Sequence, residues 1–236
     1  MSLTLYSHPF SAYCQKVLIA LWENDTAFIY RNLEEPGAAE ERASLWPLGR
    51  FPVLVDDGMM VAESSIIIEH LDLYHPGPVR LLPEQREAAL EVRFMDRFFD
   101  NYIMSPMQKP VYAALKGGDT RKEEALTEAR HALDISYAWL EERLSDRIWA
   151  AGESFSMADC AAAPSLFYAD WVHQIGTAFP RLREYRSQLL ARPSYARAVD
   201  EGRPYRHLLA RPSYARAVDE GRPYRHYFPL GTPDRD

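Results

Sequence analysis

A short stretch near the N-terminus carries hydroxyl and thiol groups at the start of a predicted helix. Ser11 stands just before apolar residues that recur at helical spacing, at Tyr13, Val17, Ala20 and Leu21. A hydroxyl donor and the positive end of a helix both stabilise a nearby anion, such as a thiolate. Ser11 could therefore help to stabilise an anion, and a simple N-cap role would explain the same serine equally well.

Tyr6 and Cys14 are the other candidates for such chemistry in this stretch. Tyr6 closes an apolar strand pattern over residues 3–6 and could offer its phenolic hydroxyl. Cys14 lies one turn inside the predicted helix, where a thiol is typically a small buried apolar group. A mixed disulfide at Cys14 is the reactive alternative. The residues alone leave the choice among Ser11, Tyr6 and Cys14 open.

Two residue pairs could hold an extended ligand. Pro52 follows Phe51 and begins an apolar run, where a proline cannot donate to a sheet. A cis bond would leave the backbone of Phe51 able to pair with an extended peptide, whereas a trans bond would start an edge strand. Glu63 and Ser64 stand where a strand ends and a helix begins. An N-cap at Ser64 would suit a carboxylate and Glu63 an ammonium, or both could only cap the helix.

The first third of the chain alternates strand and helix patterns that would position these residues. Strand patterns cover residues 3–6, 27–33, 51–56 and 59–62, and the last two flank Asp57-Gly58, a strong hairpin signal. One helix pattern starts at residue 13, a second extends to residue 46, and a third starts near residue 67. This order predicts a four-stranded mixed sheet with helices on its faces.

Strand signals nearly vanish after the Pro/Gly-rich segment 75–78, which indicates a linker. Ser156 and Asp159 have the spacing of a helix capping box. We therefore predict an α/β domain over residues 1–76 and an all-helical domain over 84–236. Some aromatic and methionine side chains of the second domain could line an apolar pocket or belong to the core, namely Phe98, Tyr102, Met104 and Met107.

The C-terminal region contains an identical tandem repeat. Residues 189–207 and 208–226 have the same sequence without a single change. Solenoid repeats normally diverge and need about three copies to stack, so a solenoid is a poor explanation. A recent duplication or a sequence-assembly error accounts better for the identity, and one copy should be surplus to the core.

Composition excludes several classes of function. A net charge of −7 argues against binding to a nucleic-acid backbone. The two cysteines, Cys14 and Cys160, cannot form a zinc cage or a disulfide framework, so we expect no metal site and a reducing compartment. Because the N-terminus lacks a signal-peptide pattern and no apolar run reaches about 20 residues, we expect a cytoplasmic protein without a membrane partner.

Taken in order, these motifs resemble the cytosolic glutathione S-transferase family. Residues 6–17 are similar to its first strand, active-site loop and first helix, and residues 49–54 look like its Gly-x-Val-Pro-x-Leu loop. Residues 62–66 resemble its Glu-Ser glutathione motif, and residues 156–159 fit the capping box of its second domain. The resemblance implies an α/β thioredoxin-like N-terminal domain plus an all-α C-terminal helical bundle.

The resemblance also implies a set of site residues. Glutathione would be the co-substrate, with its γ-glutamyl end at Glu63 and Ser64 and its glycine carboxylate at Arg50, which stands where the family often has a lysine. The implied glutathione-binding residues are Arg50, Phe51, Pro52, Glu63 and Ser64. Ser11 matches the activating serine of the theta- and zeta-like classes and is the expected catalytic residue.

The expected reaction is attack of the glutathione thiolate on a small apolar electrophile, in a homodimer as is typical of the family. A glutathione-dependent isomerase of the maleylacetoacetate type is one alternative, although that class carries Ser-Ser-Cys where residues 10–14 read Phe-Ser-Ala-Tyr-Cys. A non-catalytic interaction protein related to the transferases is the other alternative.

Overall fold

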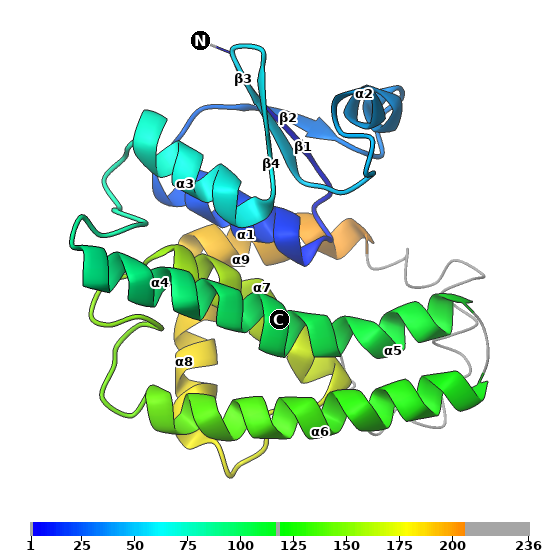
Figure 1. Ribbon diagram of the computed structural model, residues 1–236, viewed down its shortest axis with the longest axis vertical. Helices are drawn as coiled ribbons and strands as arrows, with labels where there is room; N and C mark the ends of the chain where they lie inside the picture. Colours follow the sequence, from blue (N-terminus) through cyan, green and yellow to red (C-terminus); the bar gives the residue numbers. More distant parts are fainter. Residues whose placement is uncertain (1, 117–118, 206–236) are drawn as a thin grey trace.

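The computed structural model describes residues 2–116 and 119–205 (Figure 1). The first copy of the repeat falls in this range up to residue 205, and the second copy, 208–226, lies outside the described residues. Within the described part, none of the helices has the length and apolar composition that a bilayer crossing requires.

Four short strands form one mixed sheet. They are β1 (Leu3–Ser7), β2 (Ile29–Asn32), β3 (Val53–Asp56) and β4 (Met59–Ala62), in the spatial order β2-β1-β3-β4. β1 runs parallel to β2, and β3 runs antiparallel to both β1 and β4. The mixed sheet predicted from the strand patterns is confirmed.

The turn between β3 and β4 has the geometry that its two residues favour. Asp56 pairs with Met59, which leaves a loop of two residues. Asp57 and Gly58 both have positive φ angles, 43° and 88°. A two-residue hairpin of this type needs positive φ at both positions, which an Asp-Gly pair readily adopts. The predicted hairpin is confirmed.

Three helices accompany the sheet: α1 (Ala12–Glu23), α2 (Ala38–Leu45) and α3 (Ser64–Tyr74). Figure 1 shows α1 and α3 between the sheet and the C-terminal helices, with α2 away from them. Every residue of α1 from Cys14 to Leu21 is buried, because α1 also contacts α7 and α9. Charged residues are uncommon in a helix that is covered on all sides, so the buried Lys16 is unusual.

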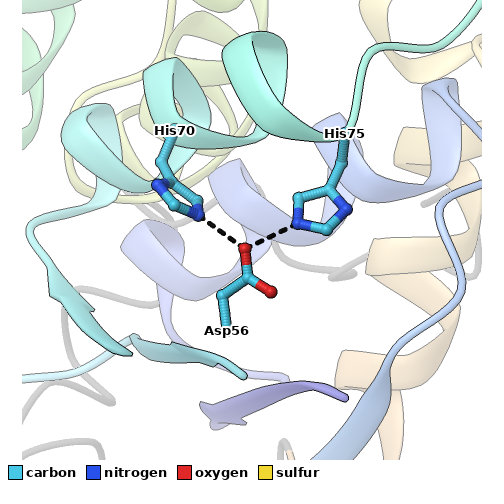
Figure 2. A group of neighbouring side chains, drawn as sticks. All are labelled: Asp56, His70 and His75. Carbon is cyan, nitrogen blue, oxygen red and sulfur yellow. Dashed lines mark hydrogen bonds and ion pairs between the residues drawn. The ribbon is translucent and has the colours of Figure 1, made fainter. Parts of the chain in front are cut away.

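The C-terminal end of α3 is tied to the end of β3 by three side chains (Figure 2). The Oδ2 atom of Asp56 lies 2.8 Å from Nε2 of His70 and 2.7 Å from Nε2 of His75. Asp56 is the last residue of β3, and His75 is the C-cap of α3. This contact therefore fixes the C-terminal part of α3, away from the start of the helix at Ser64.

From residue 86 to residue 202 every described element is helical. These elements are α4 (Arg86–Phe98), a π-helical turn η1 (Phe99–Met104), α5 (Ser105–Lys116), α6 (Asp119–Arg143), α7 (Met157–Val172), α8 (Pro180–Leu190) and α9 (Pro193–Gly202). The predicted fold class, a thioredoxin-like α/β part followed by a helical part, is confirmed.

The start of α7 carries the predicted capping box. The Ser156 side chain meets the backbone at Asp159, and the Asp159 carboxylate accepts a hydrogen bond of 2.9 Å from the Ser156 backbone. The same buried carboxylate also accepts hydrogen bonds from the Ala150 backbone at 2.9 Å and from the Tyr185 hydroxyl at 2.6 Å. The capping box therefore also anchors the loop before α7 and helix α8.

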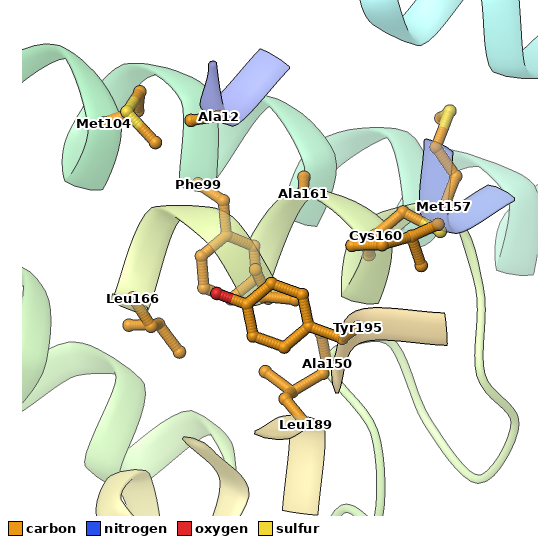
Figure 3. Close-up of a cluster of buried hydrophobic side chains, with 14 of the residues drawn as sticks. Ala12, Phe99, Met104, Ala150, Met157, Cys160, Ala161, Leu166, Leu189 and Tyr195 are labelled. Atoms are coloured by element: carbon orange, nitrogen blue, oxygen red, sulfur yellow. The ribbon is translucent and has the colours of Figure 1, made fainter. Parts of the chain in front are cut away.

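One apolar core runs through both parts of the molecule. Figure 3 shows side chains of η1, α7, α8 and α9 gathered in it, near Ala12 of α1. The predicted domain boundaries, 1–76 and 84–236, stay predictions. The first copy of the repeat contributes Leu189, Tyr195 and Ala198 to this core, each at most 1% exposed. The copy at 189–207 is thus part of the fold over its described residues.

Candidate functional site

A cavity of about 650 Å³ is lined by the starts of α1 and α3, by the loop before β3, and by helices of the C-terminal part. All the site residues predicted from the sequence line it, namely Ser11, Arg50, Phe51, Pro52, Glu63 and Ser64. The structure therefore brings together residues that are up to 53 positions apart along the chain. Their individual roles stay predictions.

The loop that carries Ser11 is held from two sides. The Gln15 side-chain amide donates a hydrogen bond of 2.9 Å to the Pro9 carbonyl, and the Tyr168 hydroxyl donates one of 3.2 Å to the Phe10 carbonyl. Gly202 of α9 also lies against this loop, since a Cβ there would come within 3.3 Å of the Pro9 carbonyl oxygen. The position of Ser11 thus depends on α1, α7 and α9 together.

Ser11 is the N-cap residue of α1, and its side chain makes no capping hydrogen bond. The backbone N–H groups in the first turn of a helix have no partner inside the helix, and the helix dipole places partial positive charge there. Because Ser11 is half-buried in the cavity wall, its hydroxyl and this helix end can act on the same anion.

The N-terminus of α3 reaches the same cavity, but the predicted N-cap was wrong by one residue. Glu63, not Ser64, is the N-cap, and Ser64 is the first residue of the helix. β4 ends at Ala62, so Glu63 alone joins strand to helix, and it does so with a φ of 71°. Positive φ is uncommon for a residue other than glycine. The Glu63 side chain makes no capping hydrogen bond.

The loop before β3 forms another side of the cavity. The Phe51–Pro52 peptide bond is cis, one of the two forms that the residues alone left open. Pro52 is buried, whereas Arg50 and Phe51 are exposed at the cavity edge. The Arg50 carbonyl accepts a hydrogen bond of 3.5 Å from the Arg42 side chain in α2. The loop therefore places the cationic side chain of Arg50 at the edge of the cavity.

The two rivals of Ser11 are less well placed. The Tyr6 hydroxyl donates to the Glu41 carboxylate at 3.2 Å, and Tyr6 does not line the cavity. Cys14 is fully buried, and this burial raises the pKa of its thiol even though the backbone N–H of His8 donates a hydrogen bond of 3.3 Å to its sulfur. A buried thiol with a raised pKa is a poor nucleophile.

A buried network of charged residues lies next to Ser64. The Lys16 ammonium is 2.6 Å from Asp96 and 2.9 Å from Asp100, and it donates a hydrogen bond of 2.9 Å to the Ser65 hydroxyl. Arg97 adds contacts of 2.8 Å to Asp96 and 2.5 Å to Asp100. The network therefore joins α1, the first turn of α3, α4 and η1 beneath one wall of the cavity.

Sequence reasoning missed this network. Its signal was present, because Lys16 interrupts an apolar helix face, and Asp96 and Asp100 stand among aromatic residues in the sequence Phe-Met-Asp-Arg-Phe-Phe-Asp. Asp100 lines the cavity, and burial raises the pKa of its carboxyl more than the nearby Lys16 lowers it. Asp100 lies in η1, and π-helical turns are frequent at functional sites.

The helical part supplies the apolar side of the cavity. Met104 and Met107, two of the four candidates for such a lining, are there together with Val111. Phe98 and Tyr102 are not, and Phe98 stacks instead on Trp139 with ring centroids 4.4 Å apart. Methionine side chains adapt to ligands of different shapes, which suits a site for small apolar molecules.

Tyr13 is a further cavity residue, one that the sequence marked only as part of the apolar face of a helix. Burial raises the pKa of its hydroxyl to about 12. At neutral pH the hydroxyl is therefore protonated and can act only as a neutral hydrogen-bond donor or acceptor.

Comparison with known proteins agrees with this geometry. Residues 5–79 match the glutathione S-transferase N-terminal domain, and residues 94–193 match the glutathione S-transferase C-terminal domain. The chain belongs to the glutathione S-transferase family. The two matches together cover most of this family member, including Ser11, the loop at 50–52 and the start of α3.

Similar curated proteins carry different names. This family member is 25% identical to the stringent starvation protein A homolog of Haemophilus influenzae, over 86% of the chain and 92% of that protein. It is 28% identical to the FtsZ-localized protein A of Caulobacter vibrioides, over 81% and 88%. It is 26% identical to the maleylacetoacetate isomerase of Pseudomonas aeruginosa, over 86% and 98%.

Solved structures show the same fold. FzlA from C. crescentus superposes with a TM-score of 0.72 at 25% identity and covers 85% of this chain and 92% of its own. A glutathione S-transferase from Rhodospirillum rubrum superposes with a TM-score of 0.70 at 26% identity, over 83% and 91%.

Proposed function

We propose that this chain is a glutathione transferase in which Ser11 stabilises the thiolate of glutathione for attack on a small apolar electrophile. The main support is that one cavity has Ser11 at one helix N-terminus, Ser64 at another, and methionine side chains in its lining. This arrangement fits the serine-type classes of the glutathione S-transferase family, and we include membership of such a class in the proposal.

The donor set suits a peptide with charges at both ends. Glutathione carries an ammonium and a carboxylate at its γ-glutamyl end, which Glu63 and the N-terminus of α3 would bind. Its glycine carboxylate would pair with Arg50, and its extended backbone would pair with that of Phe51 as an added strand. Each of these residues lines the cavity.

The proposed mechanism requires Ser11 to lower the pKa of the glutathione thiol only modestly. A thiol has a pKa of about 8.5, and only the thiolate attacks. A drop of about 2 units corresponds to roughly 2.7 kcal/mol, which one charge-assisted hydrogen bond together with a helix dipole can supply. The sulfur would then bond to the electrophilic carbon as the leaving group departs, while Met104 and Met107 contact the apolar body of the electrophile.

The first test is the initial rate of conjugation of glutathione to an aryl halide. Ser11→Ala should lower the rate roughly 100-fold at neutral pH, the effect of losing one donor to a developing anion, while glutathione still binds. Ser44→Ala on the exposed helix α2 is the matched control and should keep the wild-type rate. An undiminished rate in Ser11→Ala would remove this serine from the mechanism.

A binding function without turnover is the second candidate. It is favoured by the names of two relatives, stringent starvation protein A homolog and FtsZ-localized protein A, which describe a starvation response and a localisation, not a reaction. Binding of glutathione by the wild type with no turnover of any aryl halide, epoxide or maleylacetoacetate would select this candidate. Turnover of maleylacetoacetate alone would select the isomerase instead.

We also propose that the chain forms a two-fold homodimer, as is typical of its family. Light scattering during size-exclusion chromatography should then give twice the mass of the chain. A mass of one chain at micromolar concentration would contradict this part of the proposal.

A further inference from the structure

Three potential ligand atoms lie close together near the C-terminal ends of β3 and α3, away from Ser64. One carboxylate oxygen of Asp56 and one ring nitrogen each of His70 and His75 all lie within 4.8 Å of one another. Figure 2 shows both rings turned toward the same oxygen. The three side chains are largely buried, with 12%, 8% and 18% of their surfaces exposed.

The chemistry of this group suits a transition metal. Imidazole nitrogens and a carboxylate oxygen are typical ligands of Zn²⁺ and of other divalent first-row metals, and two histidines with one carboxylate form a known three-ligand set. His75 is the C-cap of α3, and the C-terminal end of a helix carries partial negative charge that favours a cation.

We propose that Asp56, His70 and His75 form a binding site for a divalent transition metal, with Zn²⁺ as the first candidate and water in the remaining position. Metal binding would need changes of about 1.5 Å or less between ligand atoms, because the two ring nitrogens, within 4.8 Å of each other, would also have to approach. Ligand atoms about 2.0 Å from a tetrahedral Zn²⁺ lie roughly 3.3 Å apart. The two nitrogens, now 2.8 and 2.7 Å from the oxygen, would each move away by about half an ångström.

Such a metal would stabilise the first part of the fold. It would link the last residue of β3 to the last turn of α3 and to His75 at the start of the segment 75–78. His70 and His75 follow Ser64 by 6 and 11 residues, which places them about 9 and 16 Å along the helix from its cavity end. We therefore expect metal binding to raise stability and to leave glutathione turnover unchanged.

The test is calorimetric titration of chelator-treated full-length protein with Zn²⁺. We expect one saturable equivalent, and at a free Zn²⁺ concentration of 100 times Kd the unfolding equilibrium should shift about 100-fold toward the folded state. His70→Gln and His75→Gln should each weaken binding at least 10-fold, the usual effect of perturbing a metal site. Absence of saturable binding to the wild type would overturn the proposal.

Two control variants separate this site from other histidines. His173 lies 2.6 Å from the exposed Asp134, and this pair has no third ligand among the residues that the structure describes, so His173→Gln should bind Zn²⁺ like the wild type. The double variant His207→Gln, His226→Gln removes the histidine of each repeat copy and should also bind normally. Loss of the equivalent in either control would overturn the assignment to His70 and His75.

A spectroscopic readout covers the case in which a ligand variant fails to fold. Co²⁺ added to the wild type should give visible absorption bands of a nitrogen- and oxygen-ligated ion, and Zn²⁺ should abolish them. Bands that are absent from the folded wild type would count against the site independently of any variant.

Discussion

The two ends of the unit formed by β3 and α3 handle polar groups in opposite ways. At the cavity end, the first turn of α3 and the loop at 50–52 border an open space, and the Glu63 side chain does not cap the helix. At the other end, Asp56, His70 and His75 contact one another directly. The same two elements thus present backbone groups to the cavity at one end and gather side chains at the other.

The two ends differ in the groups that they expose. The cavity end is bordered by the starts of two helices, so backbone groups border it as well as side chains. The opposite end depends on side chains alone. Changes at the two ends should therefore separate activity from stability.

The largest effect should come from breaking the buried network beneath the cavity. Lys16→Met would leave Asp96 and Asp100 with only the half-exposed Arg97 as a cationic partner, and removing one member of a buried ion pair typically costs about 3–5 kcal/mol. Urea unfolding measures this loss. The control is Arg93→Gln, whose exposed pair with Glu69 should contribute less than about 1 kcal/mol. Equal losses in both variants would contradict the importance given to burial.

A smaller loss of stability is expected at the opposite end. Asp56→Asn removes the charged acceptor shared by His70 and His75 and should lower the free energy of unfolding by about 1–3 kcal/mol in the presence of a chelator. Asp134→Asn, at the exposed pair with His173, is the matched control and should cost less than about 1 kcal/mol. Glutathione turnover should be unchanged in both, and a large fall in turnover would contradict the separation of the two ends.

At the cavity end a comparable change should affect binding instead of stability. Ser64→Ala should weaken glutathione binding about 10-fold, which corresponds to roughly 1.4 kcal/mol. Because Ser64 is buried but is not the N-cap, the free energy of unfolding should change by no more than about 1 kcal/mol. Calorimetry with glutathione and urea unfolding measure the two quantities. Unchanged affinity would argue against the role of this serine.

The smallest effect is expected at the cysteines. Cys14 and Cys160 are buried, and burial raises the pKa of both thiols. Iodoacetamide should therefore label neither residue in the folded protein at neutral pH and both in urea. Rapid labelling of Cys14 in the folded state would revive it as a reactive group.

Much of the fold and of the cavity could be predicted because the signals are local. Asp57-Gly58 specifies its hairpin through the φ angles it readily adopts, and Ser156 with Asp159 specifies a helix start through hydrogen bonds three residues apart. The position of the N-cap at Glu63 could not be predicted, because it depends on how closely β4 and α3 follow each other. The second copy of the repeat lies outside the described residues, so whether it is surplus stays a prediction.

The sequence by itself determined the strands, the helices, the family resemblance and six of the residues that line the cavity. Only the tertiary structure decided that Lys16 meets Asp96 and Asp100, that Asp56 meets His70 and His75, and that the first copy of the repeat belongs to the core. The physical reason is that turns and caps depend on neighbours along the chain, whereas these contacts depend on how whole helices and strands pack against each other.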